Sequence, residues 1–181
     1  VAARFSQTIR QPQSAERLAE TATMALKDEL ETEKVALWLF SSEEPVVKRF
    51  IENEPTLTIA LDPALADQVV NIAGPVFTDS EAGLALARCL PDVSSLTVHG
   101  LWVPLIDRER ALGLLYIGPR WTGEVFGEED LRLVRLLTVP LGLAFANIYQ
   151  VERLQAMQRQ ILLAEENERY KIARELHDTV L

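Results

Sequence analysis

Two adjacent residues near the end of the chain, His177 and Asp178, have the side chains best suited to chemistry. A neutral imidazole is a nucleophile near neutral pH, and a neighbouring carboxylate can hold the tautomer that leaves the other ring nitrogen free to attack. Such a pair can accept a phosphoryl group and hand it on. The residues before the pair are charged and helically spaced, so we expect it to lie on an exposed helix.

The composition is that of a soluble protein with one domain and an appended helix. Its net charge of −9 repels phosphate backbones, so we expect no nucleic-acid partner. No uncharged run approaches the roughly 20 residues that span a bilayer, and we expect no membrane segment. Cys89 is the single cysteine, which excludes an intrachain disulfide and favours a cytoplasmic protein. Because the chain starts with Val1, we interpret it as a piece of a longer protein and leave an upstream membrane anchor open.

The first half of the sequence alternates helical and strand patterns. A helix is predicted over 14–31 with Ser14 as its N-cap, and another over 63–70 with Asp62 as its N-cap. The remaining predicted elements are strands at 35–40, 46–51, 56–61 and 76–77 and a helix at 80–90.

Two apolar runs, 96–106 and 111–117, are separated by four charged residues. A polar connection of this length predicts adjacent antiparallel strands. Carboxylates at 128–130 favour the positive end of a helix dipole, so we expect the next helix to start there. From that point to the end of the chain, only Pro140 and Gly142 interrupt helical patterning.

The final helix changes character near Gln150. A broad apolar face suited to a sheet precedes it and comprises Leu133, Leu136, Leu137, Leu141, Ala144 and Ile148. A narrower seam suited to a partner helix follows it and comprises Val151, Leu154, Met157, Ile161, Ala164, Ile172, Leu176 and Val180. The spacing of these apolar residues departs from a regular heptad repeat, and such departures locally overwind or unwind a coiled coil. We therefore expect a signalling helix, from about residue 145 onward, that forms a homodimer.

The order helix, two strands, variable middle, hairpin and helix resembles the GAF domain, a small sensory module. The most specific stretches are Val103-Pro104-Leu105-Ile106, Leu112-Gly113-Leu114-Leu115-Tyr116-Ile117-Gly118 and Phe126-Gly127-Glu128-Glu129-Asp130-Leu131. The resemblance implies an α+β fold with an antiparallel sheet between helices and a long C-terminal coiled-coil helix. It divides the chain into an extension at 1–13, a GAF sensory domain at 14–150, and, at 151–181, a signalling helix with the start of a phosphoacceptor domain.

Residues 168–178 read Glu-Arg-Tyr-Lys-Ile-Ala-Arg-Glu-Leu-His-Asp. They are similar to the phosphoacceptor motif Glu-Arg-x-Arg-Ile-Ala-Arg-Glu-Leu-His-Asp of sensor histidine kinases and depart from it mainly at Lys171. The resemblance implies that His177 is autophosphorylated, that Asp178 is its acid–base neighbour, and that a response-regulator receiver domain accepts the phosphoryl group. The glutamine that this family uses in dephosphorylation would lie four residues after Asp178, one position past Leu181.

By the same resemblance, the full-length kinase uses ATP and Mg²⁺ on a separate catalytic domain. No Gly-rich or Asn-bearing ATP-binding segment occurs in these residues, so we expect no cofactor in this chain and no autophosphorylation by it alone. Arg169, Lys171 and Arg174 could steer phosphates, but their alternation with glutamates is also typical of a solvated helix face.

The GAF resemblance also suggests a pocket for an unknown small molecule, with Trp38, Trp102 and Tyr116 as candidate lining residues. Aromatic side chains on apolar strands are more often core, so both interpretations stay open. His99 is the fourth candidate, as a haem ligand, although a strand histidine is more often hydrogen-bonded structure.

Cys89 has the placement of the cysteine that attaches bilin in related domains, but Leu90-Pro91 follows where those domains usually have histidine. We therefore favour a buried thiol. A cyclic-nucleotide pattern is incomplete, because its lysine is missing from the set Asn71, Phe77, Asp79 and Glu81. We expect neither haem nor bilin, and no metal site.

Three interpretations of the chain follow. It is the sensory and dimerisation portion of a histidine kinase, a ligand-binding regulatory module whose terminal helix only dimerises, or a ligandless scaffold for dimer assembly. The motif around His177 favours the first. The sequence does not identify the sensed signal, the occupancy of the pocket or the response regulator.

Overall fold

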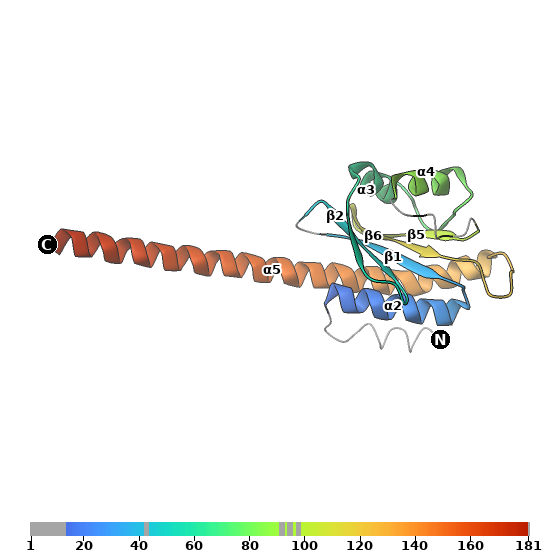
Figure 1. Ribbon diagram of the computed structural model, residues 1–181, viewed down its shortest axis with the longest axis horizontal. Coiled ribbons are helices and arrows are strands. Elements are labelled where there is room, and N and C mark those ends of the chain that lie inside the picture. The colour runs from blue at the N-terminus through green and yellow to red at the C-terminus, as the bar shows by residue number, and fades with distance from the viewer. Residues whose placement is uncertain (1–13, 42–43, 91–92, 94–95, 97–98, 181) are drawn as a thin grey trace. The chain divides into compact units, whose positions relative to one another are not determined.

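The computed structural model describes residues 14–41, 44–90, 93, 96 and 99–180. Within them it shows a six-stranded antiparallel sheet with helices on both faces (Figure 1), which confirms the predicted α+β class. The chain divides into two compact units, Val1–Ala146 and Asn147–Leu181, and the sheet lies in the first.

The sheet is built around a central pair of strands. Its order is β3-β2-β1-β6-β5-β4, and every neighbouring pair is antiparallel. Every residue of β1 is buried, so helices must cover both faces of the sheet. The strands are β1 (Val35–Phe40), β2 (Val46–Ile51), β3 (Leu57–Ala60), β4 (Val76–Phe77), β5 (Leu101–Asp107) and β6 (Arg110–Ile117).

Helices α3 (Pro63–Val70) and α4 (Glu81–Cys89) cover one face of the sheet (Figure 1). Asp62 caps α3, as predicted, because its carboxylate accepts a hydrogen bond of 2.9 Å from the Ala64 N–H. Ser80 caps α4 by accepting a bond of 3.1 Å from the Gly83 N–H.

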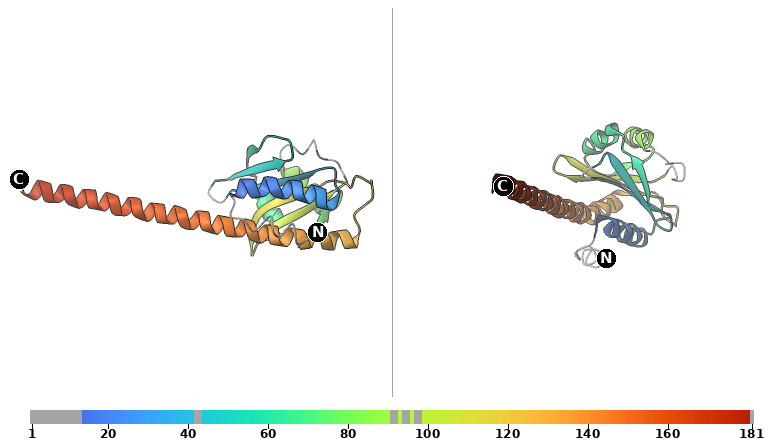
Figure 2. Two further views of the ribbon diagram at one scale, coloured as in Figure 1. Left: turned by 90° about the horizontal axis from the view of Figure 1, so that it is seen from below. Right: turned by 60° about the vertical axis from the view of Figure 1, so that its left-hand side comes forward.

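Helix α2 (Ala15–Leu30) and the first part of α5 (Glu128–Val180) lie side by side across the opposite face (Figure 2). Ser14 caps α2 as predicted, with its hydroxyl accepting from the Arg17 N–H at 3.4 Å. The buried side of α2 comprises Ala15, Leu18, Ala19, Ala22, Thr23, Leu26 and Leu30.

The predicted strand at 96–106 was placed too early, because β5 starts at Leu101. Leu101 pairs with Ile117, where β6 ends, so no partner residue on β6 remains for the preceding positions. Residues 97–98 lie outside the described part of the chain. The predicted hairpin itself is confirmed, and Arg108 in its turn has a left-handed backbone with φ 55°.

Helix α5 starts at a carboxylate, as predicted. Asp130 accepts a hydrogen bond of 2.8 Å from the Gly127 N–H and also pairs with Arg120, which fixes the entry of the chain into the helix. The helix then continues through Pro140 and Gly142 without a break.

Part of α5 is apolar enough to cross a membrane by length and composition, with a window of mean hydropathy 1.5 that is 39% buried. The buried side chains in the first part of the helix include Val134, Leu137, Leu141 and Phe145. Core packing accounts for these side chains, whereas Leu136, Val139 and Leu143 in the same part of the helix are exposed.

Gly83→Ala is expected to lower the free energy of unfolding by about 2 kcal/mol or more, because a Cβ atom at Gly83 would lie 2.1 Å from the Phe77 carbonyl oxygen. Gly142→Ala is the matched control in α5. Its Cβ would lie an ordinary 3.9 Å from the Ile106 carbonyl oxygen, and alanine favours a helix over glycine by about 1 kcal/mol. Urea unfolding followed by circular dichroism measures both, and equal effects would contradict this packing.

Candidate functional site

The predicted phosphoacceptor His177 lies on α5, and its side chain is exposed. Asp178 is also in α5, but its side chain lies outside what the structure describes. Every side chain from 157 to 177 is exposed, including those of Arg169, Lys171 and Arg174. An imidazole on an exposed helix can be reached by a nucleotide-binding domain, but its role stays a prediction.

Three of the four pocket candidates lie together on the sheet. Trp38, Trp102 and Tyr116 come from β1, β5 and β6 and form an aromatic cluster. The centroids of the two indole rings are 5.5 Å apart at 61°, and those of Trp102 and Tyr116 are 5.2 Å apart at 57°, both within the range of favourable aromatic pairs.

The aromatic cluster is part of the core between the sheet and the helices α3 and α4. It packs with Leu65 and Val69 of α3 and Leu86 of α4, and each aromatic residue is at most 2% exposed. The indole Nε1 atoms of Trp38 and Trp102 have no hydrogen-bond partner within the described part of the chain. Unpaired buried donors of this kind cost free energy, so a ligand with acceptor atoms could use them.

His99 and Cys89 are less buried than the aromatic rings. His99 is exposed just before Gly100, ahead of the first residue of β5. Cys89 ends α4 and is half-buried against the apolar layer below it.

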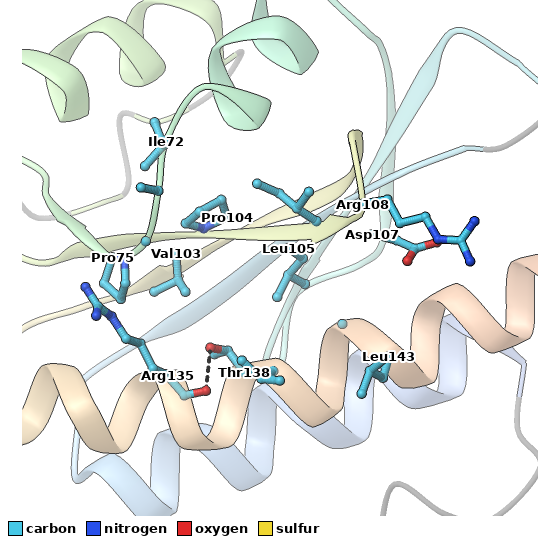
Figure 3. Close-up of a pocket in the computed structure, with 15 residues that line it drawn as sticks. Ile72, Pro75, Val103, Pro104, Leu105, Asp107, Arg108, Arg135, Thr138 and Leu143 are labelled. Carbon is cyan, nitrogen blue, oxygen red and sulfur yellow. Dashed lines mark hydrogen bonds between the residues drawn. The ribbon is translucent and has the colours of Figure 1, made fainter.

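Sequence reasoning missed a groove of about 480 Å³ on the first unit (Figure 3). It lies between β5, the segment after α3 and the first part of α5. The lining residues are Ile72, Ala73, Gly74, Pro75, Val103, Pro104, Leu105, Ile106, Asp107, Arg108, Arg135, Thr138, Val139, Gly142 and Leu143. The available signals were Gly74 and Pro75 in the segment after α3, Pro104 in β5 and Gly142 in α5.

Trp102→Ala is expected to lower the free energy of unfolding by about 3–5 kcal/mol, because a large core side chain would be replaced by a cavity. Trp121→Ala is the control, since Trp121 is 58% exposed and its removal should change stability by about 0.5 kcal/mol or less. Chemical denaturation measures both. If the Trp102 variant lost no more stability than the Trp121 variant, the aromatic cluster would not be core.

No protein-family model and no curated protein sequence matches this chain. Solved structures do. The chain is similar to residues 122 to 287 of a methyl-accepting chemotaxis protein, with a TM-score of 0.63, 12% identity, and coverage of 81% of this chain and 98% of that chain.

Two GAF domains of histidine kinases are also similar. The domain from the potassium sensor histidine kinase KdpD of Escherichia coli gives a TM-score of 0.56 at 14% identity, covering 85% of this chain and 96% of that chain. The domain from a two-component sensor histidine kinase of Bacillus halodurans gives 0.53 at 18%, covering 78% and 99%. At such identities the likeness concerns the fold, and the chain therefore has the GAF fold.

Proposed function

We propose that this chain is the sensory and dimerisation portion of a two-component sensor histidine kinase, in which the GAF fold regulates phosphorylation of His177. The observation that carries the proposal is the position of the motif at 168–178 on α5, where the side chains of residues 168–177 are exposed. That helix begins in the same unit as the GAF sheet. Two of the similar structures are GAF domains of sensor histidine kinases.

The chemistry would need little from this chain besides one nucleophile. A ring nitrogen of His177 attacks the γ-phosphorus of ATP, an N–P bond forms, the bond to the bridging oxygen breaks, and ADP leaves. Asp178 would hold the tautomer that keeps the attacking nitrogen unprotonated. ATP and Mg²⁺ would come with a catalytic domain, and a receiver domain would then accept the phosphoryl group. We expect this to take place in the cytoplasm.

Substitution of His177 tests the proposal. The chain is joined in one polypeptide to an ATP-binding domain of this kinase class and given radiolabelled ATP. We expect acid-labile phosphate on the wild type and none on His177→Gln, because glutamine cannot form the N–P bond.

His99→Gln is the matched control, since His99 is the other of the two histidines and is also exposed. It should be labelled like the wild type. Equal labelling of the wild type and the His177 variant would refute the assignment of the phosphoacceptor.

We also propose that α5 forms a homodimer through its seam. Leu154, Met157 and Ile161 recur at steps of three and four residues, and each is about half exposed or more in the single chain. Large apolar side chains in such a row are typical of a helix that packs on a partner helix. The second copy of the chain is the partner that this seam fits, because like seams pack with twofold symmetry.

Sedimentation equilibrium tests the seam. Ile161→Glu should raise the dimer dissociation constant by about a hundredfold or more, since it places a charge in an apolar interface. Leu163→Glu is the control, because Leu163 is equally exposed at 59% but lies on another face of the helix.

A chain that ends at Gln150 should likewise become monomeric. If that truncated chain remained a dimer, the GAF-fold surface and not the seam would hold the two copies together. Equal effects of the two glutamate variants would also count against the seam.

A further inference from the structure

The groove beside β5 is separate from the aromatic cluster and from His177. Its three walls are the segment after α3, one edge of β5, and α5 from Arg135 to Leu143 (Figure 3). Its volume of about 480 Å³ falls within the range of small-molecule sites, about 300–1,000 Å³.

An arginine lies at each end of the groove. In Figure 3, Arg135 lies beside Pro75, whereas Arg108 lies beyond the C-terminal end of β5. Within the described residues, neither has a carboxylate partner at salt-bridge distance. Asp107 also lines the Arg108 end, so the Arg135 end is the more positive of the two.

Gly74 makes room for the guanidinium of Arg135. A Cβ atom at Gly74 would lie 3.1 Å from Nη2 of Arg135, which is closer than most side-chain contacts. The bare glycine therefore lets the guanidinium lie against the backbone of the segment after α3. The planar guanidinium of Arg135, an exposed residue, offers paired N–H donors that match the two oxygens of a carboxylate.

Between the two arginines the groove is mostly apolar. Val103 and Leu105 of β5 are buried in its wall, whereas Val139 and Leu143 of α5 are exposed along it. A ligand that covered these side chains would remove apolar surface from water. The groove therefore suits an anion with an apolar body better than a compact, multiply charged anion.

The edge of β5 argues against a peptide strand as the occupant. Its partner β4 reaches only Trp102, so the rest of this edge is open. On this edge the Gly100 carbonyl oxygen accepts a hydrogen bond from the Thr78 N–H. Backbone groups of alternate residues in a strand point to the same edge, so the backbone nitrogen of Pro104, four residues later, also faces this edge. Since proline has no N–H, the middle of the edge lacks the donor that an added strand would need.

We infer that this groove binds a small organic carboxylate, which pairs with Arg135 and places its apolar body between β5 and α5. Such a ligand would contact α5 beside Pro140, where the helix lacks one backbone hydrogen bond. The binding does not depend on phosphorylation of His177, so it holds or fails independently of the proposed function.

Amide NMR of the isotope-labelled full chain tests the inference with two probes, 3-phenylpropionate and octanoate. We expect saturable shifts at Gly74, Val103 and Gly142 with both. Arg135→Gln should weaken binding by about ten- to a hundredfold, because a charge-assisted hydrogen bond is lost. Gly142→Leu should abolish it, since the new side chain would enter the groove where a Cβ meets only the Ile106 carbonyl oxygen at 3.9 Å.

Arg132→Gln is the matched control. Arg132 lies nearly one turn earlier on the same helix, outside the groove, and faces Glu128 at 3.9 Å, so its loss should leave the affinity unchanged. The neutral 3-phenylpropanol and inorganic phosphate should both bind at least about tenfold more weakly than the carboxylates.

Several results would overturn the inference. These are the absence of groove shifts with both carboxylates, equal binding of the alcohol or of phosphate, or equal losses in the Arg132 and Arg135 variants. Because Gly142→Leu could unfold the protein, its spectrum must retain the dispersed amide signals of the sheet. If the Gly142→Leu variant has lost these signals, the comparison of Arg135→Gln with Arg132→Gln alone tests the inference.

Discussion

Burial of both faces of the central strand pair is the constraint on which the rest of the structure depends. All six residues of β1 and seven of the eight in β6 are buried. A sheet that is apolar on both faces needs a helical layer on each. Helices α3 and α4 cover the aromatic cluster, whereas α2 and the first part of α5 cover the other face. Up to Ala146 one side of α5 is buried in this core, whereas Leu136, Val139 and Leu143 on the same part of the helix and the later seam are exposed.

Features with a local cause could be predicted from the sequence. The caps Ser14 and Asp62 accept the hydrogen bonds expected of them, because capping depends on residues two or three positions away. The start of β5 could not be predicted in this way. It depends on where β6 ends, because Leu101 pairs with Ile117, the last residue of that strand. The end of a strand depends on how far its partner strand extends, so it cannot be predicted from one stretch of sequence alone.

The same distinction separates the two candidate sites. The motif ending at His177 is contiguous, so its residue types and spacing can be recognised without any tertiary structure. The groove combines Gly74, Arg135 and the edge of β5, which are distant in sequence and share no pattern. Its signals were a proline in a strand and glycines near loops and in a helix, which have many other causes. These residues can be assigned to one site only when the structure shows that three elements pack around it.

The two places where a small molecule could enter this fold differ in energetic cost. Between the sheet and α3, Trp102 and its aromatic neighbours are almost fully buried, so a ligand there must displace packed rings and forfeit their contacts. The groove is already open and needs only to be filled. One of its walls is α5, the helix that also carries His177, and Pro140 interrupts the hydrogen bonding of α5 beside it. A ligand in the groove would therefore contact α5 beside Pro140, where the helix lacks one backbone hydrogen bond.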